Sequence, residues 1–158
     1  MQFTKTKEKP LCFLDWLFVY FCSDFSQNFM EKAELVKFWL DSAAEDLTVC
    51  ESLFEKKHYD WCLFIGHLVL EKVLKALWIR EHYPELHPRI HNLDKLAERI
   101  PLELTDQQRA YLLEVNMFYL QGRYPEEKSE FYKICTRDFT QQNFHAIKEF
   151  YQWLLTQF

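Results

Sequence analysis

Apolar residues recur every three or four positions along most of the chain, which is the spacing of side chains on one face of an α-helix. The pattern predicts helices over residues 31–57, 61–83, 93–100, 105–122 and 141–158. Residues 131–135, FYKIC, are ambiguous between strand and helix, and no other segment alternates as a strand would. The sequence therefore predicts an all-α fold, an up-and-down bundle of four to five helices.

Polar residues between these segments predict where the helices begin. Asn92 precedes the helix at 93–100 as a cap, and Thr105 with Gln108 has the spacing of a capping box. Asp138 or Thr140 is expected to cap the last helix.

The fourth helix ends in the stretch FYLQGRYP, residues 118–125. Gly122 is expected to take the left-handed conformation that closes a helix, and Pro125 to prevent its continuation. That exit would present Arg123, whose guanidinium suits phosphate or carboxylate, and Tyr124, whose ring can stack on a base. The structural alternative is that Arg123 binds the terminal carbonyls or an acidic neighbour.

The helix at 61–83 is apolar almost all round, so it is expected to be central. Its polar exceptions His67, Glu71 and Lys75 are spaced by four and share one strip, with Lys72 beside it. The default interpretation is an i,i+4 ion pair on a solvated face, worth about 0.3–0.5 kcal/mol. The alternative is that the strip lines a groove against the helix at 105–122.

Composition bounds the possible functions. The chain has 158 residues, of which 49% are hydrophobic, enough for one domain with its own core. The net charge of −5 argues against a general nucleic-acid coat, so any RNA or nucleotide would need a local cluster of cations. Only two glycines are present, which excludes a phosphate-cradling glycine loop, and no cofactor is predicted.

The five cysteines form no CxxC pair, which indicates free thiols and a cytoplasmic protein. The N-terminal segment LCFLDWLFVYFC is too short to cross a membrane and is interrupted by Asp15, so no membrane association is predicted. Met30 directly precedes the first helix. We expect a domain at 30–158, and residues 1–29 to be an extension from an upstream start or an extra helix.

Three histidines, His82, His87 and His91, lie within ten residues of each other. No metal site is predicted from them, because Pro84 and Pro88 break the helix that would align them. His91 stands immediately before the third helix, where it can bond a backbone group or meet an anion.

In order and spacing, three stretches of this chain resemble the landmarks of the HEPN domain family: WLDSAAEDL leading to LEKVLKALW, HPRIHNLDKLAERI, and NMFYLQGRYP. The resemblance covers residues 31–158. It implies a helical bundle, usually a homodimer, with a cleft for nucleotide or RNA. Many members act with a separate minimal nucleotidyltransferase chain as a toxin–antitoxin pair. The matching positions are Glu71, Lys72, Lys75, His91, Asn92, Arg123, Tyr124 and Pro125.

The chain departs from the ribonuclease members of that family. Those members carry an arginine followed after four to six residues by a histidine, whereas the next histidine after Arg123 is His145. Arg80 and His87 satisfy the spacing but straddle Pro84. We therefore expect a module that binds a nucleotide, RNA or partner without cutting RNA. The alternatives are a metal-independent ribonuclease using Arg123 with His91 or with a histidine from across a dimer, and a ligand-free scaffold.

Overall fold

A computed structural model of the chain describes residues 31–123 and 125–158, without the side chains of 122–128. Within these ranges the chain forms six helices: α2 (Lys32–Glu55), α3 (Tyr59–His82), α4 (Leu93–Ala97), α5 (Asp106–Arg123), α6 (Pro125–Ile134) and α7 (Arg137–Leu155). No strand occurs in the part of the chain that is described. The all-α prediction is confirmed, and Lys32–Phe158 forms one compact unit. The predicted boundary at residue 30 falls outside the described residues.

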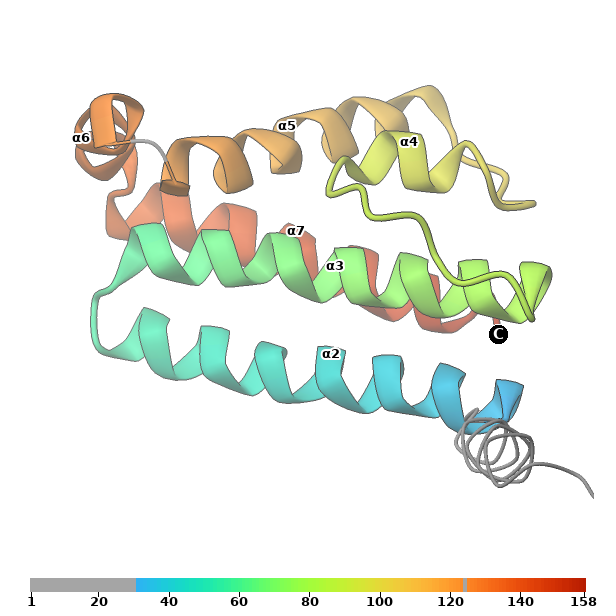
Figure 1. The fold of residues 1–158 in the computed structure, drawn as a ribbon. Coiled ribbons are helices and arrows are strands. Elements are labelled where there is room, and N and C mark those ends of the chain that lie inside the picture. Colours follow the sequence, from blue (N-terminus) through green and yellow to red (C-terminus); the bar gives the residue numbers. More distant parts are fainter. Residues whose placement is uncertain (1–30, 124) are drawn as a thin grey trace, which may run out of the picture. The chain divides into compact units, whose positions relative to one another are not determined.

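Helix α3 is the centre of the bundle. It runs antiparallel beside α2, with α7 behind it and α4 and α5 along its other side (Figure 1). Its apolar positions are buried almost all round, as the sequence predicts, while α2 buries only Ala43 and Cys50. A helix that is apolar on every side can be stable in water only when other helices cover it.

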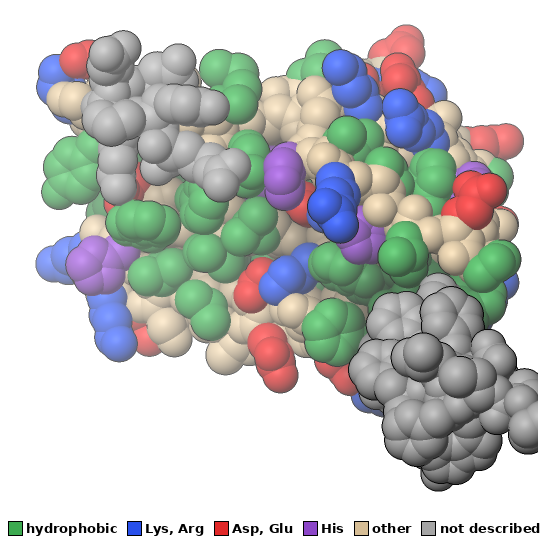
Figure 2. Space-filling view, viewed as in Figure 1, with side chains coloured by type: hydrophobic (Ala, Val, Ile, Leu, Met, Phe, Trp, Pro, Cys, Tyr) green, Lys and Arg blue, Asp and Glu red, His purple; other side chains and the backbone are tan. Residues whose placement is uncertain are grey.

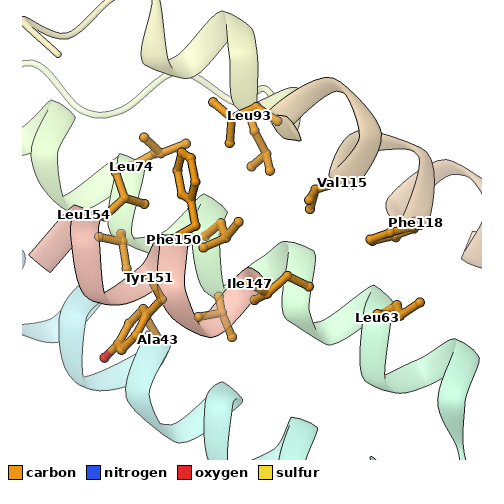
Figure 3. Close-up of a cluster of buried hydrophobic side chains, with 14 of the residues drawn as sticks. Ala43, Leu63, Leu74, Leu93, Val115, Phe118, Ile147, Phe150, Tyr151 and Leu154 are labelled. Atoms are coloured by element: carbon orange, nitrogen blue, oxygen red, sulfur yellow. The ribbon is translucent and has the colours of Figure 1, made fainter. Parts of the chain in front are cut away.

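The core lies where α3 meets α5 and α7. Leu63 and Leu74 of α3 pack with side chains of α5 and α7 (Figure 3). Leu154 and Ile147 of α7 are fully buried. In the described part of the chain, no helix combines the length and the apolar run that crossing a membrane would require.

Two of the predicted caps are present. Asn92 accepts a hydrogen bond from the backbone N–H of Lys95, and the Thr105 hydroxyl and Gln108 amide form a reciprocal capping box. The prediction for the last helix is wrong, because Thr136 caps α7 by accepting from Phe139 N. Asp138 and Thr140 lie inside that helix.

Among the described residues, the one with a left-handed conformation is Lys57, and Gly122 is helical. Helix α5 continues through Gly122 to Arg123, and α6 begins at Pro125. The expected glycine terminator is wrong because a second helix starts there at once, and proline suits a first helical position, where no N–H partner is needed. Lys57 has a φ of 65° and closes α2.

The α2 end shows why Lys57 is held in that conformation. His58 N donates to Leu53 O at 2.9 Å, and Lys57 N donates to Phe54 O at 3.1 Å. This is the Schellman arrangement, in which two orphan carbonyls are satisfied at the cost of one left-handed residue. The ambiguous segment 131–135 lies mainly in α6, so it is helical rather than a strand.

Gly66 of α3 lies in close contact with α7. A Cβ built at this position would lie 2.7 Å from Cδ1 of Ile147, which is fully buried. Gly66→Ala should therefore cost about 1 kcal/mol of unfolding free energy, because overpacking outweighs the gain in helix propensity.

The same substitution should reverse its sign when Ile147 is shortened. In an Ile147→Val background the clashing methyl group is gone, so Gly66→Ala should stabilise by up to about 1 kcal/mol. Urea denaturation of the four proteins in this double-mutant cycle measures the coupling. Additive effects would show that the helices do not meet at Gly66.

Candidate functional site

The polar strip of α3 is buried. His67, Glu71 and Lys75 are 0%, 5% and 5% exposed, and Lys75 Nζ donates to Glu71 Oε1 at 2.6 Å. The interpretation as an ion pair on a solvated face is therefore wrong. Other segments cover the strip, and a buried ion pair must be completed by further hydrogen bonds to avoid a large desolvation cost.

His91 supplies those hydrogen bonds from the loop before α4. Its Nδ1 lies 3.1 Å from both carboxylate oxygens of Glu71, and its backbone carbonyl lies 3.0 Å from Nε2 of His67. Carboxylates and carbonyls only accept, so His91 carries a proton on Nδ1 and His67 carries one on Nε2. The Glu71 carboxylate thus accepts hydrogen bonds from both Lys75 and His91.

The aromatic ring of Tyr119, on α5, covers this cluster. Its ring stacks on His67 at a centroid distance of 4.8 Å and on His91 at 4.9 Å. The His91 side chain remains 50% exposed. With Nδ1 held by Glu71 and the ring plane set by Tyr119, the Nε2 edge of His91 is the part left for a ligand.

His67 is neutral in this environment. Burial lowers its pKa to about 4, although the Glu71 carboxylate opposes the shift. Its Nδ1 has no hydrogen-bond partner and lies 3.8 Å from Glu71 Oε2. His67 therefore acts as a donor that fixes the His91 backbone rather than as a second cation.

Two asparagines hold the start of α4. Asn92 caps it, and Asn116 Oδ1 of α5 accepts from Leu93 N at 2.8 Å. Because Oδ1 is used in this way, the Nδ2 of Asn116 is a buried donor, and it has no partner within the described residues. Asn116, Asn92, His91, Tyr119 and Leu120 line a hollow of about 100 Å³.

At the other end of the strip, Trp39 of α2 packs against the loop. Lys75 Nζ lies 5.3 Å from the Trp39 ring centre, a cation–π distance, and the His87 ring packs edge-on to Trp39 at 4.6 Å. Burial, helped by the Lys75 charge, lowers the pKa of His87. The loop is thus anchored by His87 at one point and by His91 at another.

Lys72 does not join this site. It forms an ion pair with Asp46 of α2 at 2.5 Å and donates to Ser42 O at 3.4 Å. The prediction that it lines the same groove is wrong, because a residue one position after Glu71 is turned about 100° around the helix. The side chains of Arg123 and Tyr124 lie outside the described residues.

The three clustered histidines have separate partners. His82 stacks on Trp78 at 4.0 Å, His87 contacts Trp39, and His91 binds Glu71. Over the ranges that the structure describes, no group of His, Cys, Asp or Glu side chains is arranged to hold a metal ion. Arg80 contacts Gln157 O and the Phe158 ring at the end of α7, away from the Trp39 contact of His87.

Figure 2 shows histidine side chains near the middle of the face over α3, α4 and α5, with acidic and basic side chains beside them and hydrophobic ones around. Asn116 and Tyr119 fall in the apolar stripe of the helix predicted at 105–122, so sequence reasoning missed their part in the site. The signal was an asparagine within that stripe, since a buried amide needs specific partners.

The low pKa of His67 predicts that the free energy of unfolding falls in acid. Between pH 6.5 and about 4 the unfolded chain binds a proton at this residue and the folded chain does not. Stability from this group is present above pH 6.5 and is lost as the pH falls through that window, by on the order of 3 kcal/mol. His67→Gln, whose amide can still donate to His91 O, should flatten this part of the stability-versus-pH curve.

His145→Gln is the matched control, since His145 is an exposed histidine that is ion-paired to Glu149 on the same element. Urea titrations at several pH values compare the three proteins. An unchanged acid slope in His67→Gln would contradict the neutral, buried assignment.

Comparison with known proteins places the fold. No curated protein matches the chain. Among solved structures, the crystal structure of TT1696 from Thermus thermophilus superposes with a TM-score of 0.67 at 15% sequence identity, covering 78% of this chain and 98% of that one. At this identity the likeness shows the fold alone. The HEPN domain family matches residues 36–157, most of the described bundle, and the chain therefore belongs to the HEPN domain family.

Proposed function

We propose that this HEPN chain binds a nucleotide or RNA at the α3–α4–α5 face and does not cut RNA. In this proposal the chain is a homodimer that acts with a separate minimal nucleotidyltransferase chain in a toxin–antitoxin-like pair. The observation that carries the ligand part is the held imidazole of His91. It is bonded to Glu71 through Nδ1, stacked on Tyr119, and half exposed at the edge of a hollow.

The hollow offers the chemistry that a base or sugar would use. Its polar groups are the Asn116 and Asn92 side chains and the Nε2 edge of His91, while Leu120 and Tyr119 supply apolar surface. A site with a few fixed polar groups on an apolar wall is typical of small-ligand recognition. Its volume of about 100 Å³ suits one inserted ring or sugar rather than a whole nucleotide.

The phosphate would then lie beyond the hollow. Arg123 ends α5, one helical turn after Tyr119. The resemblance and this position in the chain support Arg123 as the phosphate-binding residue, with Tyr124 beside it. Lys75 is unsuited to that role because its ammonium group is already bound to Glu71 and is buried.

The homodimer is supported by the outward side of α5. Leu113, Met117 and Leu120 are 53%, 44% and 43% exposed at spacings of four and three residues, which form an apolar stripe. Such stripes on a helix mark interaction surfaces. The stripe borders the hollow through Leu120, so a second copy on it would lie next to the proposed ligand.

The proposal predicts that binding depends on His91. In calorimetric titration with AMP, ATP and a short single-stranded RNA, His91→Ala should weaken affinity about tenfold or more for at least one of them, because the fixed polar edge is lost. Arg123→Ala should weaken binding most for the ligands with more phosphate.

His145→Ala removes a more exposed histidine, which lies on α7 outside the hollow, and should leave affinity unchanged. Equal binding by His91→Ala and the native protein would contradict the site. The absence of heat with every ligand, together with a stable dimer in light scattering, would instead indicate a ligand-free scaffold.

A ribonuclease activity is the second candidate, and one observation favours it. Glu71 holds Nδ1–H of His91, so Nε2 would be the basic atom, which is the way a carboxylate orients a general base in many enzymes. Such a base could assist attack by a ribose 2′-hydroxyl without a metal.

Under our proposal, incubation of the pure protein with total RNA and a chelator leaves the RNA intact. Degradation that is abolished by His91→Ala or by Arg123→Ala, and retained in His145→Ala, would replace the binding function with the ribonuclease. Gel electrophoresis of the RNA over time is the measurement.

A further inference from the structure

Helices α5 and α7 leave a groove between them on the side of α5 away from the hollow. They approach each other through Tyr111 and Phe150, whose rings lie 5.8 Å apart, and through the Tyr111 hydroxyl, which donates to Asn143 O at 3.3 Å. Beside these contacts lies an open groove of about 570 Å³. This volume is within the range of about 300–1,000 Å³ that is usual for ligand sites.

The floor of the groove is apolar and partly aromatic. Tyr111, Phe150 and Trp153 line it, together with Ala110 of α5 and Ala146 of α7. The two alanines stand on opposite walls, where small side chains allow another backbone to approach closely. The lining positions repeat at helical spacing on both walls, 107, 110, 111 and 114 on α5 and 146, 149, 150 and 153 on α7.

The rim of the groove is acidic. Glu114 lies on the α5 wall and Glu149 on the α7 wall, and no lysine or arginine is among the residues that line the groove. Burial, together with the charges of Glu114 and Glu149, raises the pKa of Tyr111, so both carboxylates act on the floor of the same groove. Glu114 has no ion-pair partner among the described residues, and Glu149 has only the exposed His145 at 3.4 Å.

We propose that the α5–α7 groove binds an amphipathic helix of a partner protein that carries lysine or arginine on both sides of a short apolar stripe. A helix laid between two helices buries side chains at positions i, i+3 or i+4, and i+7, and the groove is two helical turns long, about 10 Å. Basic flanks would meet Glu114 on one wall and Glu149 on the other, which sets specificity and association rate.

Charge selects a basic partner over a second copy of the chain. The net charge of the chain is −5, and the same groove on a second copy would present the same carboxylates. The groove and the His91 hollow use different sides of α5, since 110, 111 and 114 line one and 116, 119 and 120 line the other. The inference is therefore independent of the nucleotide site.

Two synthetic peptides test this groove. Each is a helix of about 18 residues with leucines at i, i+4 and i+7, flanked by lysines in one peptide and by glutamates in the other. Fluorescence anisotropy of the labelled peptides should show binding of the lysine peptide alone. Glu114→Lys/Glu149→Lys should weaken that peptide at least about tenfold and gain affinity for the glutamate peptide.

Two further variants separate the groove from general attraction between opposite charges. Glu45→Lys/Glu98→Lys makes the same change in net charge at exposed positions outside the groove and should alter affinity less than about twofold. Ala146→Trp fills the groove without changing charge and should also abolish binding, with a thermal melt to check folding.

The proposal is overturned if the lysine peptide does not bind at up to about 1 mM, since a matched helix groove exceeds that affinity. It is equally overturned if the two charge-reversal pairs weaken binding to the same extent. Equal binding of the two peptides to the native protein would also exclude a groove that selects basic helices.

Discussion

A buried ion pair on the central helix constrains the rest of this molecule. Glu71 and Lys75 lie one turn apart on α3, where both are almost entirely removed from water. Their attraction alone does not repay the desolvation of two charges, so the remaining acceptor capacity of the carboxylate must be satisfied. His91 does this, and its position explains why the loop after α3 returns along the helix that it has just left (Figure 1).

The same contact joins structure to function. The loop is fixed by its backbone to His67, by its side chain to Glu71, and by the Tyr119 ring above. One edge of His91 faces outward as a result, beside the Asn116 amide. A polar group that is held on several sides needs little reordering when a ligand arrives, which favours binding. The acidic groove on the other side of α5 has none of this network and depends on shape and charge instead.

The sequence predicts the parts of this arrangement that depend on local spacing. Helical repeats revealed α3 as the central helix and brought His67, Glu71 and Lys75 onto one strip, and the caps at Asn92 and Thr105 follow from nearest neighbours. The burial of the strip depends on residues 20 and 48 positions after Glu71, His91 and Tyr119, which local patterns do not connect. The ion pair of Lys72 with Asp46 was missed for the same reason, because the two residues lie on different helices, far apart in the sequence.

The left-handed turn at Lys57 escaped prediction because backbone hydrogen bonds, rather than a glycine, hold it there. Residues 1–29 and the side chains of Arg123 and Tyr124 lie outside the described residues.

The sharing of one carboxylate among several donors also bears on how this chain can diverge. Losing either Glu71 or Lys75 alone would leave the other charge unpaired in the interior, at a cost of about 3–5 kcal/mol, whereas exchanging both of them together with His91 for apolar residues can be nearly neutral. Among descendants of this sequence, the three positions should therefore change in concert, and a lineage that has lost all three would keep the bundle while giving up the oriented imidazole.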